Sequence, residues 1–308
     1  MKILVLFTGG TIGSSTDDGI ISLDDGSRSL LIRMYRESAG AAADDVTFTT
    51  RIPYTILSED LSAREINLLL RALEESVKED FDGIIVTHGT DTQQYAAAAC
   101  ALRFGSFGFY SQNEPPGACP PIIFVSSERP LGEEGSNGLA NFTAAVDFIR
   151  ARSVSGVGIS YRNAVNEPVV LHDPLKTMSH HETAPGLVSH SSFSAAYDPI
   201  PDGFEFPEHS GILTVGAYPG QIYQFGDLLP YRAVLLRPYH SATLNTASAA
   251  FRAFCADVGN AGLPMFLSGC PVRAMYETTQ VYRELGIQVM LYGPFPADYM
   301  SLWAKYGY

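Results

Sequence analysis

Residues 1–13, MKILVLFTGGTIG, place an apolar run directly before a turn rich in glycine and threonine. The residues Ile3–Phe7 are all apolar, without the alternation of a half-exposed strand, and this pattern is typical of a parallel strand covered on both faces. The turn is therefore expected at the carboxyl end of a buried strand. Further strands are predicted at Val46–Thr50, Gly83–Val86, Pro121–Val125 and Gly156–Ser160.

Helical patterns alternate with these strands. Ser62 and Glu65 have the spacing of a capping box, and apolar residues follow at helical spacing as far as Val77. Two more helices are predicted at Thr92–Phe104 and from Leu139 to Ile149. Such alternation predicts right-handed βαβ crossovers, and hence an α/β fold with a doubly wound, mostly parallel sheet.

The alternation stops near residue 183 and resumes near residue 211. Residues 186–210 are rich in Ser, Pro, His and Asp and have no period, so we predict a linker there. It would join a larger N-terminal domain, residues 1–185, to a smaller α/β C-terminal domain, residues 211–308. In the second domain, strands are expected at Gly211–Val215, Ala233–Arg237, Pro264–Leu267 and Ile287–Leu291, and helices near 246–258, 277–285 and 296–305.

Composition and charge exclude several classes of function. The 308 residues are 46% hydrophobic and 17% charged, which fits a globular chain, and the net charge of −13 argues against nucleic-acid or anionic-membrane partners. No apolar run has the length of a membrane span, and the first residues lack a signal-peptide pattern, so we expect a cytoplasmic protein. The spacing of the four cysteines argues against a zinc site and a disulfide framework, and favours free thiols: Cys100, Cys119, Cys255 and Cys270.

Two turns of unusual composition follow predicted strands. The first is TGGTIG, residues 8–13, and the second is THGTDT, residues 87–92. Open doubly wound sheets bind ligands at the carboxyl ends of their strands, beside the reversal in strand order. Glycines allow a ligand to approach the backbone closely, and successive N–H groups can form an oxyanion site.

Both turns also have plainer interpretations. TGGTIG can be a flexible turn whose hydroxyls cap the next helix, and it lacks the spacing of a phosphate-binding loop. Thr90 or Asp91 can cap the helix that follows. His88 is more readily explained as a structural histidine than as a base, because no nucleophile adjoins it in sequence.

Together, TGGTIG and HGTDT (residues 88–92) resemble the two signatures of the bacterial-type L-asparaginases, which include asparaginase/glutaminases. The segment SSERPLG, residues 126–132, is similar to the GSQRPLGE segment of that family, and residues 136–141 are similar to its (S/T)DG…N run. AYPG, residues 217–220, resembles the turn that opens the family's second domain. We expect a short, divergent, cytoplasmic-type member without the extra amino-terminal domain of the related tRNA-dependent amidotransferase subunit.

The resemblance implies amide hydrolysis by a threonine nucleophile, without metal or cofactor. Thr11 matches the nucleophile, and Thr90 and Asp91 match two members of a second catalytic cluster. Lys176, in HDPLK, is the best match for the lysine of that cluster, although a solvated loop lysine is the plain alternative. We expect Asp91 to hold Lys176, and burial to lower the pKa of this lysine toward a value suited to proton relay.

The resemblance also implies how an amino-acid substrate is held. Asp91 matches the position that binds the α-ammonium, and Ser58 matches the serine that binds the α-carboxylate. Glu59 stands where the family has glutamine or serine, and either strengthens ammonium binding or faces solvent. Gly10 and Gly89 are expected to line the substrate site, beside the N–H groups that stabilise the oxyanion.

Three departures from the family pattern affect turnover and assembly. Residues 13–25 contain no tyrosine where the family has one in a mobile loop, and Ile20 takes the corresponding position. HSATLN, residues 240–245, replaces the GxGN turn that reaches the neighbouring subunit, and DPLK replaces RTTK. The resemblance implies at least a homodimer, and a tetramer is the larger alternative.

The function that the resemblance implies is hydrolysis of L-asparagine to L-aspartate and ammonia through an acyl-threonine intermediate. A glutaminase-leaning amidohydrolase stays open, because one methylene is worth only about 1–3 kcal/mol in a pocket. A second alternative is an amino-acid-binding or regulatory protein with impaired catalysis. A third, a cofactor-binding fold in which both motifs are simple turns, lacks a phosphate-binding fingerprint.

Overall fold

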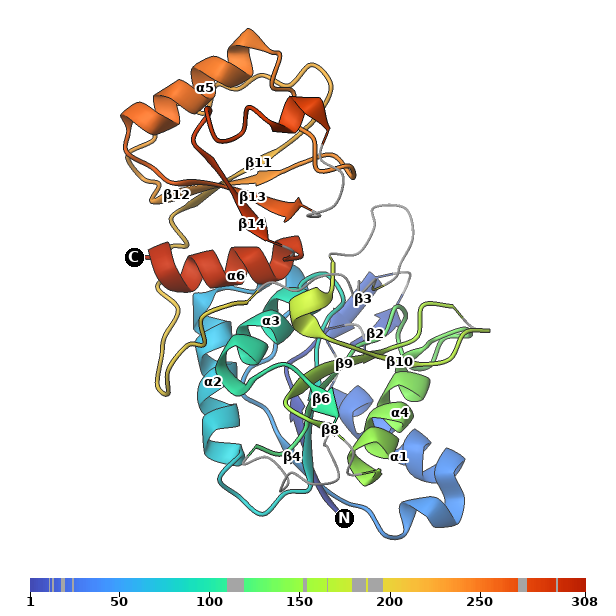
Figure 1. Ribbon diagram of the computed structural model, residues 1–308. Helices are drawn as coiled ribbons and strands as arrows, with labels where there is room; N and C mark the ends of the chain where they lie inside the picture. The colour runs from blue at the N-terminus through green and yellow to red at the C-terminus, as the bar shows by residue number, and fades with distance from the viewer. Residues whose placement is uncertain are drawn as a thin grey trace. The chain divides into compact units, whose positions relative to one another are not determined.

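The computed structural model describes residues 1–10, 12, 14–17, 20–23, 25–109, 119–151, 154–164, 166–178, 187, 196–270, 276–291 and 293–308. The chain divides into two compact units (Figure 1). Unit 1 comprises Met1–Ser189 and Pro199–Glu205, and unit 2 comprises His190–Asp198 and Phe206–Tyr308. The predicted linker, 186–210, is thus shared between the two units.

Unit 1 contains a six-stranded sheet with the order β10-β9-β7-β5-β1-β4. All neighbouring pairs are parallel except β9 and β10, which are antiparallel. In chain order the parallel strands read 2-1-3-4-5, so the strand order reverses between β1 and β5. The doubly wound, mostly parallel sheet is confirmed. Its strands are β1 (Lys2–Phe7), β4 (Thr47–Arg51), β5 (Gly83–Thr87), β7 (Ile122–Val125), β9 (Val157–Tyr161) and β10 (Val170–His172).

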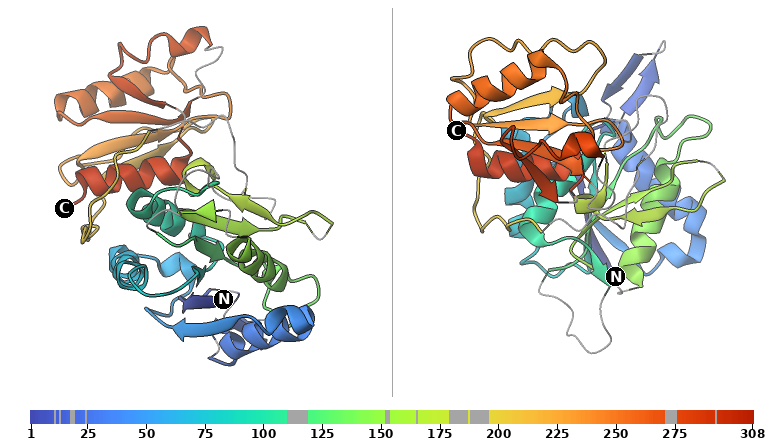
Figure 2. Two further views of the ribbon diagram at one scale, coloured as in Figure 1. Left: turned by 60° about the horizontal axis from the view of Figure 1, so that its bottom comes forward. Right: turned by 45° about the horizontal axis from the view of Figure 1, so that its top comes forward.

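Helices cover both faces of this sheet (Figure 2). The helices α1 (Asp25–Ala39) and α4 (Gly138–Arg150) pack on one face, where they share a core with alternate residues of the central strands. The other face carries α2 (Ala63–Ser76) and α3 (Gln93–Phe104). Because both faces are covered, the strands are apolar without alternation, as the sequence predicts.

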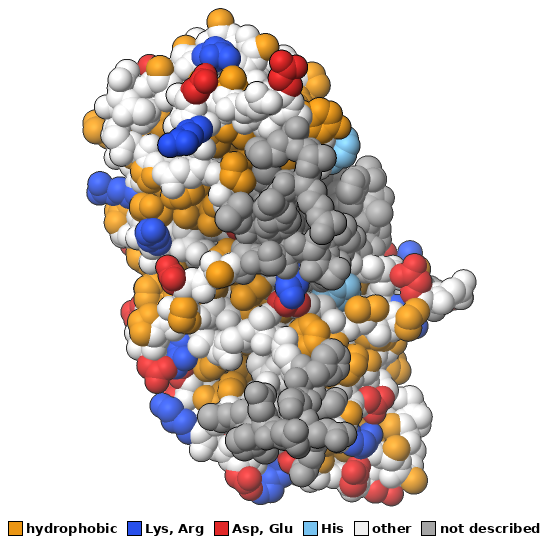
Figure 3. All heavy atoms as spheres, viewed as in Figure 1, with side chains coloured by type: hydrophobic (Ala, Val, Ile, Leu, Met, Phe, Trp, Pro, Cys, Tyr) orange, Lys and Arg blue, Asp and Glu red, His pale blue; other side chains and the backbone are white. Residues whose placement is uncertain are grey.

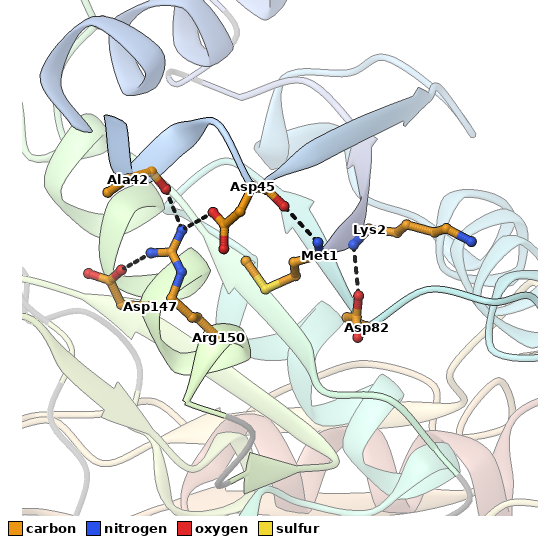
Figure 4. Close-up of polar contacts among 7 residues, drawn as sticks. All are labelled: Met1, Lys2, Ala42, Asp45, Asp82, Asp147 and Arg150. Carbon is orange, nitrogen blue, oxygen red and sulfur yellow. Dashed lines mark hydrogen bonds and ion pairs between the residues drawn. The ribbon is translucent and has the colours of Figure 1, made fainter. Parts of the chain in front are cut away.

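The amino ends of the strands are fixed by a polar cluster at the edge opposite the carboxyl ends (Figure 4). The guanidinium of Arg150, at the end of α4, donates to the Ala42 carbonyl (2.6 Å) and to the carboxylate of Asp45 (3.0 Å). Lys2 N–H donates to the carboxylate of Asp82 (2.7 Å), just before β5. These bonds tie α4 to the segment before β4, and β1 to the segment before β5.

Unit 2 contains a four-stranded parallel sheet in the order β11-β12-β13-β14. Its core on one face includes α5 (Ala249–Asn260), and α6 (Phe295–Tyr306) contacts the first three strands. All nine predicted strands of the chain are present, and only β13 shifts an end by more than one residue. The strands of unit 2 are β11 (Ile212–Gly216), β12 (Ala233–Arg237), β13 (Met265–Cys270) and β14 (Ile287–Leu291).

Two helix predictions are wrong in part. Residues 277–285 form only the 3₁₀ turn η5 (Glu277–Thr279) and further turns, and the hydroxyl of Thr279 donates to the Tyr276 carbonyl (2.6 Å). Such a local bond competes with a continuous helix. Ser62 is the N-cap of α2, but its hydroxyl donates to the Glu65 carboxylate instead of accepting a backbone N–H, so the reciprocal capping box is not formed.

Several elements were not predicted. They are the helix α1, the hairpin of β2 (Ser14–Asp17) and β3 (Ile20–Leu23), the short pair of β6 (Gly108–Phe109) and β8 (Val154–Ser155), β10, and the 3₁₀ turns η2 (Gly40–Ala43), η3 (Ser58–Asp60) and η4 (Pro174–Lys176). Among the described residues, no helix is long and apolar enough to cross a membrane. Three cysteines are free thiols, as expected: Cys100, Cys119 and Cys255.

Candidate active site

Three chain segments meet at the carboxyl edge of the unit 1 sheet, where the strand order reverses. They are the turn after β1, the turn after β5 and the segment that leads from β4 to η3. The segment after β4 pairs with the turn after β1: Gly10 N–H donates to the Ile56 carbonyl (3.1 Å), and Ile56 N–H donates to the Thr8 carbonyl (3.2 Å). The two motifs predicted from the sequence therefore lie at the reversal in strand order.

Glycine is required where these segments touch. Gly10 has a φ of 78°, and a Cβ on this residue would overlap the backbone nitrogen of Gly89. A Cβ on Gly89 would lie 2.5 Å from the Ser58 hydroxyl oxygen. The structure thus brings together three residues predicted to bind substrate: Gly10, Ser58 and Gly89.

Threonine hydroxyls hold the two turns in register. The Thr8 hydroxyl donates to the Thr87 carbonyl (2.6 Å), which joins the ends of β1 and β5. Thr92, the N-cap of α3, uses its hydroxyl to donate to the Ser58 carbonyl (2.7 Å) and makes no side-chain cap bond. The expectation that Thr90 or Asp91 caps α3 is wrong, because Thr92 occupies that position.

Asp91 is exposed, and its carboxylate makes no hydrogen bond or ion pair within the described part of the chain. Thr90 beside it is half-buried. Glu59 lies in η3 and is exposed, which agrees with the alternative that it faces solvent. Ser58, in the same turn, is buried. Thr11, the predicted nucleophile, lies outside the described residues, and so does the side chain of Ile20.

His88 is enclosed by the protein, with 1% of its surface exposed. Burial lowers the pKa of its imidazole to about 4. Its Nδ1 lies 3.0 Å from the Gly89 carbonyl oxygen, an acceptor, so Nδ1 carries the proton of the neutral ring. Nε2 is buried and has no hydrogen-bond partner in the described structure. A buried, neutral His88 fits the structural role that the sequence favours.

Lys176 lies in η4, which packs against α3 and β9. Its Nζ is 3.3 Å from the Asp173 carboxylate, three residues earlier, and no ion pair with Asp91 exists in the described structure. The expectation that Asp91 holds Lys176 is therefore corrected: the 3₁₀ turn places Asp173 beside it. The lysine side chain is 40% exposed, so it is less buried than expected.

Asp173 is itself held firmly. Its carboxylate accepts from the Ser106 hydroxyl and from the Leu175 backbone N–H (3.0 Å). These bonds fix the turn that carries Lys176 against the end of α3. The sequence contained a signal for this pair, because an acidic residue three positions before a lysine can reach it in a helical turn.

The family model "Asparaginase, N-terminal" matches residues 2–172, which is more than half of the chain. The chain belongs to the asparaginase family of amidohydrolases. The match covers both glycine- and threonine-rich turns and ends just before η4.

Relatives of known name share parts of this asparaginase-family sequence. A glutamyl-tRNA(Gln) amidotransferase subunit of Methanosarcina barkeri is 33% identical over 161 residues, which cover 50% of this chain and 34% of that protein. The corresponding protein of Haloquadratum walsbyi, which carries the same name, is 27% identical over 182 residues, covering 58% and 37%. The aligned region spans about a third of the length of these relatives.

Two solved L-asparaginase structures share the fold over nearly the whole chain. The thermostable L-asparaginase of Thermococcus kodakarensis has a TM-score of 0.72 at 19% identity, covering 100% of this chain and 94% of that chain. L-asparaginase I of Vibrio cholerae has a TM-score of 0.68 at 18% identity, covering 99% and 93%. At these identities the likeness shows a common fold.

A buried polar network joins strand ends and helix starts at the same edge of the sheet, and no sequence pattern predicted it. The Ser126 hydroxyl donates to the Gln93 side chain (2.9 Å), and the Asn141 amide donates to the Ser126 carbonyl (2.9 Å). The Ser160 hydroxyl donates to the Asn141 carbonyl (2.8 Å). This network links the carboxyl ends of β7 and β9 to the first turns of α3 and α4. For Asn141, the family resemblance was the only sequence signal.

The described residues contain no cluster of three or more His, Cys, Asp or Glu side chains that suits a metal ion. The candidate site contains hydroxyls, a carboxylate, backbone N–H groups and, in η4, one lysine. Such groups serve acyl transfer, in which a hydroxyl attacks a carbonyl and N–H groups stabilise the oxyanion.

Proposed function

We propose that this protein hydrolyses the side-chain amide of L-asparagine to L-aspartate and ammonia in the cytoplasm, through an acyl intermediate on Thr11. The observation that carries the proposal is the contact among Gly10, Ser58 and Gly89 at the reversal in strand order, with the exposed Asp91 carboxylate beside it. This arrangement offers an anion, a hydroxyl and backbone N–H groups within one small area, as an amino-acid amide requires.

Substrate binding uses the charges of the amino acid. The Asp91 carboxylate pairs with the α-ammonium, and the buried Ser58 hydroxyl donates to the α-carboxylate. Ser58 is well placed to do so, because its own carbonyl is fixed by the Thr92 hydroxyl. The side-chain amide then extends toward Thr11, and N–H groups of the glycine turns receive the developing oxyanion.

Deacylation needs a water molecule and a proton carrier. Thr90, Asp91 and Lys176 form the proposed second cluster, in which Thr90 orients the water and Lys176 exchanges the proton. The Asp173 carboxylate, 3.3 Å from the Lys176 Nζ, positions this lysine. In the acylation step the Thr11 oxygen attacks the amide carbon, and the proton that it loses passes to the departing nitrogen, which leaves as ammonia.

The decisive experiment is an ammonia-release assay with L-asparagine and L-glutamine. Thr11→Ala is expected to abolish turnover while circular dichroism stays unchanged, with Thr49→Ala, on the exposed edge strand β4, as the control. Retention of more than about a tenth of the wild-type rate in Thr11→Ala contradicts the acyl-threonine mechanism, because loss of a nucleophile normally costs several orders of magnitude.

L-glutamine is the second candidate substrate, because the named relatives are subunits of a glutamyl-tRNA(Gln) amidotransferase. The assay separates the two amides by kcat/KM. Thermal stabilisation by L-asparagine or L-aspartate with no ammonia release is the result expected for the amino-acid-binding alternative.

We infer that the protein assembles as a homodimer or homotetramer. Three large apolar side chains between β11 and β12 are exposed in the single chain: Tyr218, Ile222 and Leu229. Exposed apolar side chains that lie close in sequence favour a protein interface. On the face that Figure 3 shows, positively and negatively charged side chains are interspersed. Light scattering that finds a fully active monomer contradicts this inference.

A further inference from the structure

A pocket lies in unit 1, outside the catalytic groups proposed above. It is a cavity of about 320 Å³ between the loop after β7 and the residues that follow β9. Polar and charged side chains line most of it: Glu128, Arg129, Glu134, Asn137, Arg162 and Asn163. A cavity of this volume, lined in this way, has room for a small polar molecule.

The pocket lies on the same edge of the sheet as the candidate active site. β5, β7 and β9 are consecutive neighbours, and Arg162 directly follows β9 as His88 directly follows β5. Because neighbouring strands are about 4.8 Å apart, the backbones of these two residues are about 10 Å apart. The two sites are therefore near each other but are built from different residues.

The backbone of Arg162 is held on both sides by buried asparagines. Its N–H donates to the Asn141 side-chain oxygen (2.9 Å), and its carbonyl accepts from the Asn137 amide (2.8 Å). Both asparagines are nearly inaccessible to solvent. A backbone fixed in this way does not have to be ordered when the side chain binds a ligand.

The Nε–H group of the Arg162 guanidinium is a buried hydrogen-bond donor. Its Nε has no hydrogen-bond acceptor in the part of the chain that the structure describes, and no ion pair involves Arg162 there. A buried donor without an acceptor is costly, and a guanidinium offers two parallel N–H groups that match a carboxylate. Glu128 also lines the pocket but is exposed and does not pair with Arg162.

We propose that this pocket is a binding site for a small carboxylate, which Arg162 holds through two parallel N–H groups of its guanidinium. A carboxylate is favoured over a phosphate because Glu128 and Glu134 also line the pocket. Their negative charges repel a doubly charged ligand more strongly than a singly charged one. The positive charge of Arg129 reduces this repulsion only in part, because Arg129 is exposed and its terminal N–H already donates to the Glu134 carbonyl (3.3 Å).

The test is a titration of the whole protein with propionate, a carboxylate that lacks the amine and amide of the proposed substrate, followed by ligand-observed NMR. The wild-type protein is expected to bind propionate saturably in the millimolar range and inorganic phosphate more weakly. Arg162→Gln is expected to weaken propionate binding at least ten-fold, and Arg162→Lys, which keeps the charge but loses the planar fork, by a smaller factor. Arg129→Gln, also an arginine of this pocket, is the matched control and is expected to change the affinity less than two-fold.

Ser58→Ala separates this site from the candidate active site, because the proposal expects unchanged propionate binding in that variant. Loss of binding in Ser58→Ala but not in Arg162→Gln overturns the proposal and assigns propionate to the active site. Absence of binding to the wild-type protein, with binding to Glu128→Gln, also overturns it, because Glu128 then occupies the guanidinium in solution. None of these outcomes depends on ammonia release, so the proposed hydrolysis is tested separately.

Discussion

The carboxyl group of Asp298 makes unit 2 sensitive to pH. Asp298 lies in the first turn of α6 with 0% of its surface exposed, and it accepts from the Ser268 hydroxyl (2.6 Å) and the Tyr197 hydroxyl (2.8 Å). Burial raises the pKa of this carboxyl from 3.8 to about 7, although both hydroxyls and the Gly269 N–H favour the charged form. Gly293 lies so close that a Cβ there would overlap the carboxylate.

The sign and size of the effect follow from this pKa. The folded protein holds the proton more tightly than the unfolded chain, so the free energy of unfolding falls as the pH rises from about 4 to about 7 and is flat above that range. One pKa unit corresponds to about 1.4 kcal/mol, and the rise to about 7 therefore corresponds to a loss of about 4 kcal/mol. Asp298→Asn keeps a neutral side chain of the same shape and removes this loss.

We expect Asp298→Asn to have a larger free energy of unfolding than the wild-type protein at pH 8. Removal of the charge contributes up to about 4 kcal/mol to this difference, and altered hydrogen bonding reduces it by about 1 kcal/mol. At pH 5 the two proteins are expected to be similar, or the variant slightly weaker. The measurement is urea unfolding at several pH values, followed by the fluorescence of Trp303. This residue is the only tryptophan of the chain, lies in α6 and is 9% exposed, so it reports on unit 2.

Asp257→Asn is the control, since it removes the same charge from an exposed position on α5. It is expected to leave the pH dependence of unfolding unchanged. If the wild-type protein and Asp298→Asn lose stability with the same slope between pH 5 and pH 8, the carboxyl is not protonated in the folded protein and the reasoning is refuted.

Three further predictions concern unit 1. Asp173→Asn is expected to lower kcat at least ten-fold with little change in KM, because it frees Lys176 from its 3.3 Å ion pair. An equal loss in kcat and in substrate affinity contradicts the role of Asp173 in positioning Lys176. Gly89→Ala is expected to raise KM or abolish binding, since its Cβ would lie 2.5 Å from the Ser58 hydroxyl, and calorimetry with L-aspartate checks this. Burial lowers the pKa of His88 to about 4, so the folded state is expected to lose up to about 3 kcal/mol of stability as the pH falls from about 6.5 to 4. Unfolding followed by circular dichroism is expected to show a smaller loss of stability over this pH range in His88→Gln.

Buried strands were the most predictable part of the fold. An all-apolar run such as Ile3–Phe7 is stable only where helices cover both faces, so the pattern identifies the strand and its environment together. Helix α1 was missed because its sequence, DGSRSLLIRMYRESA, is mostly polar and buries few residues, among them Leu31 and Tyr35. The hairpin of β2 and β3 was missed because its strands have only four residues each, too short for a clear period.

The candidate site was predictable only in part. The glycine-rich turns were visible as unusual composition at strand ends, and the strand-order rule places such turns together. No period or propensity predicts that Ser58 contacts Gly89, because this depends on how the chain returns after β4; only the family resemblance pointed to it. The counterion of Lys176 was mistaken because the resemblance pointed to Asp91, while the local spacing pointed to Asp173.

This chain departs from the family pattern mainly at positions that we expect to affect turnover, and not at those that we expect to bind the substrate. The contacts among Gly10, Ser58 and Gly89 are made by backbone or by a short side chain, and they sit where β1 and β5 are held by the Thr8 hydroxyl. Two of the three departures, the loop without a tyrosine and the turn of Lys176, concern groups that the proposed mechanism assigns to proton transfer and not to binding of the α-amino and α-carboxyl groups. A chain built in this way is expected to keep its affinity for the amino acid even where its rate is low. Substrate binding that is lost together with turnover in the wild-type protein would therefore place the defect in the glycine turns themselves.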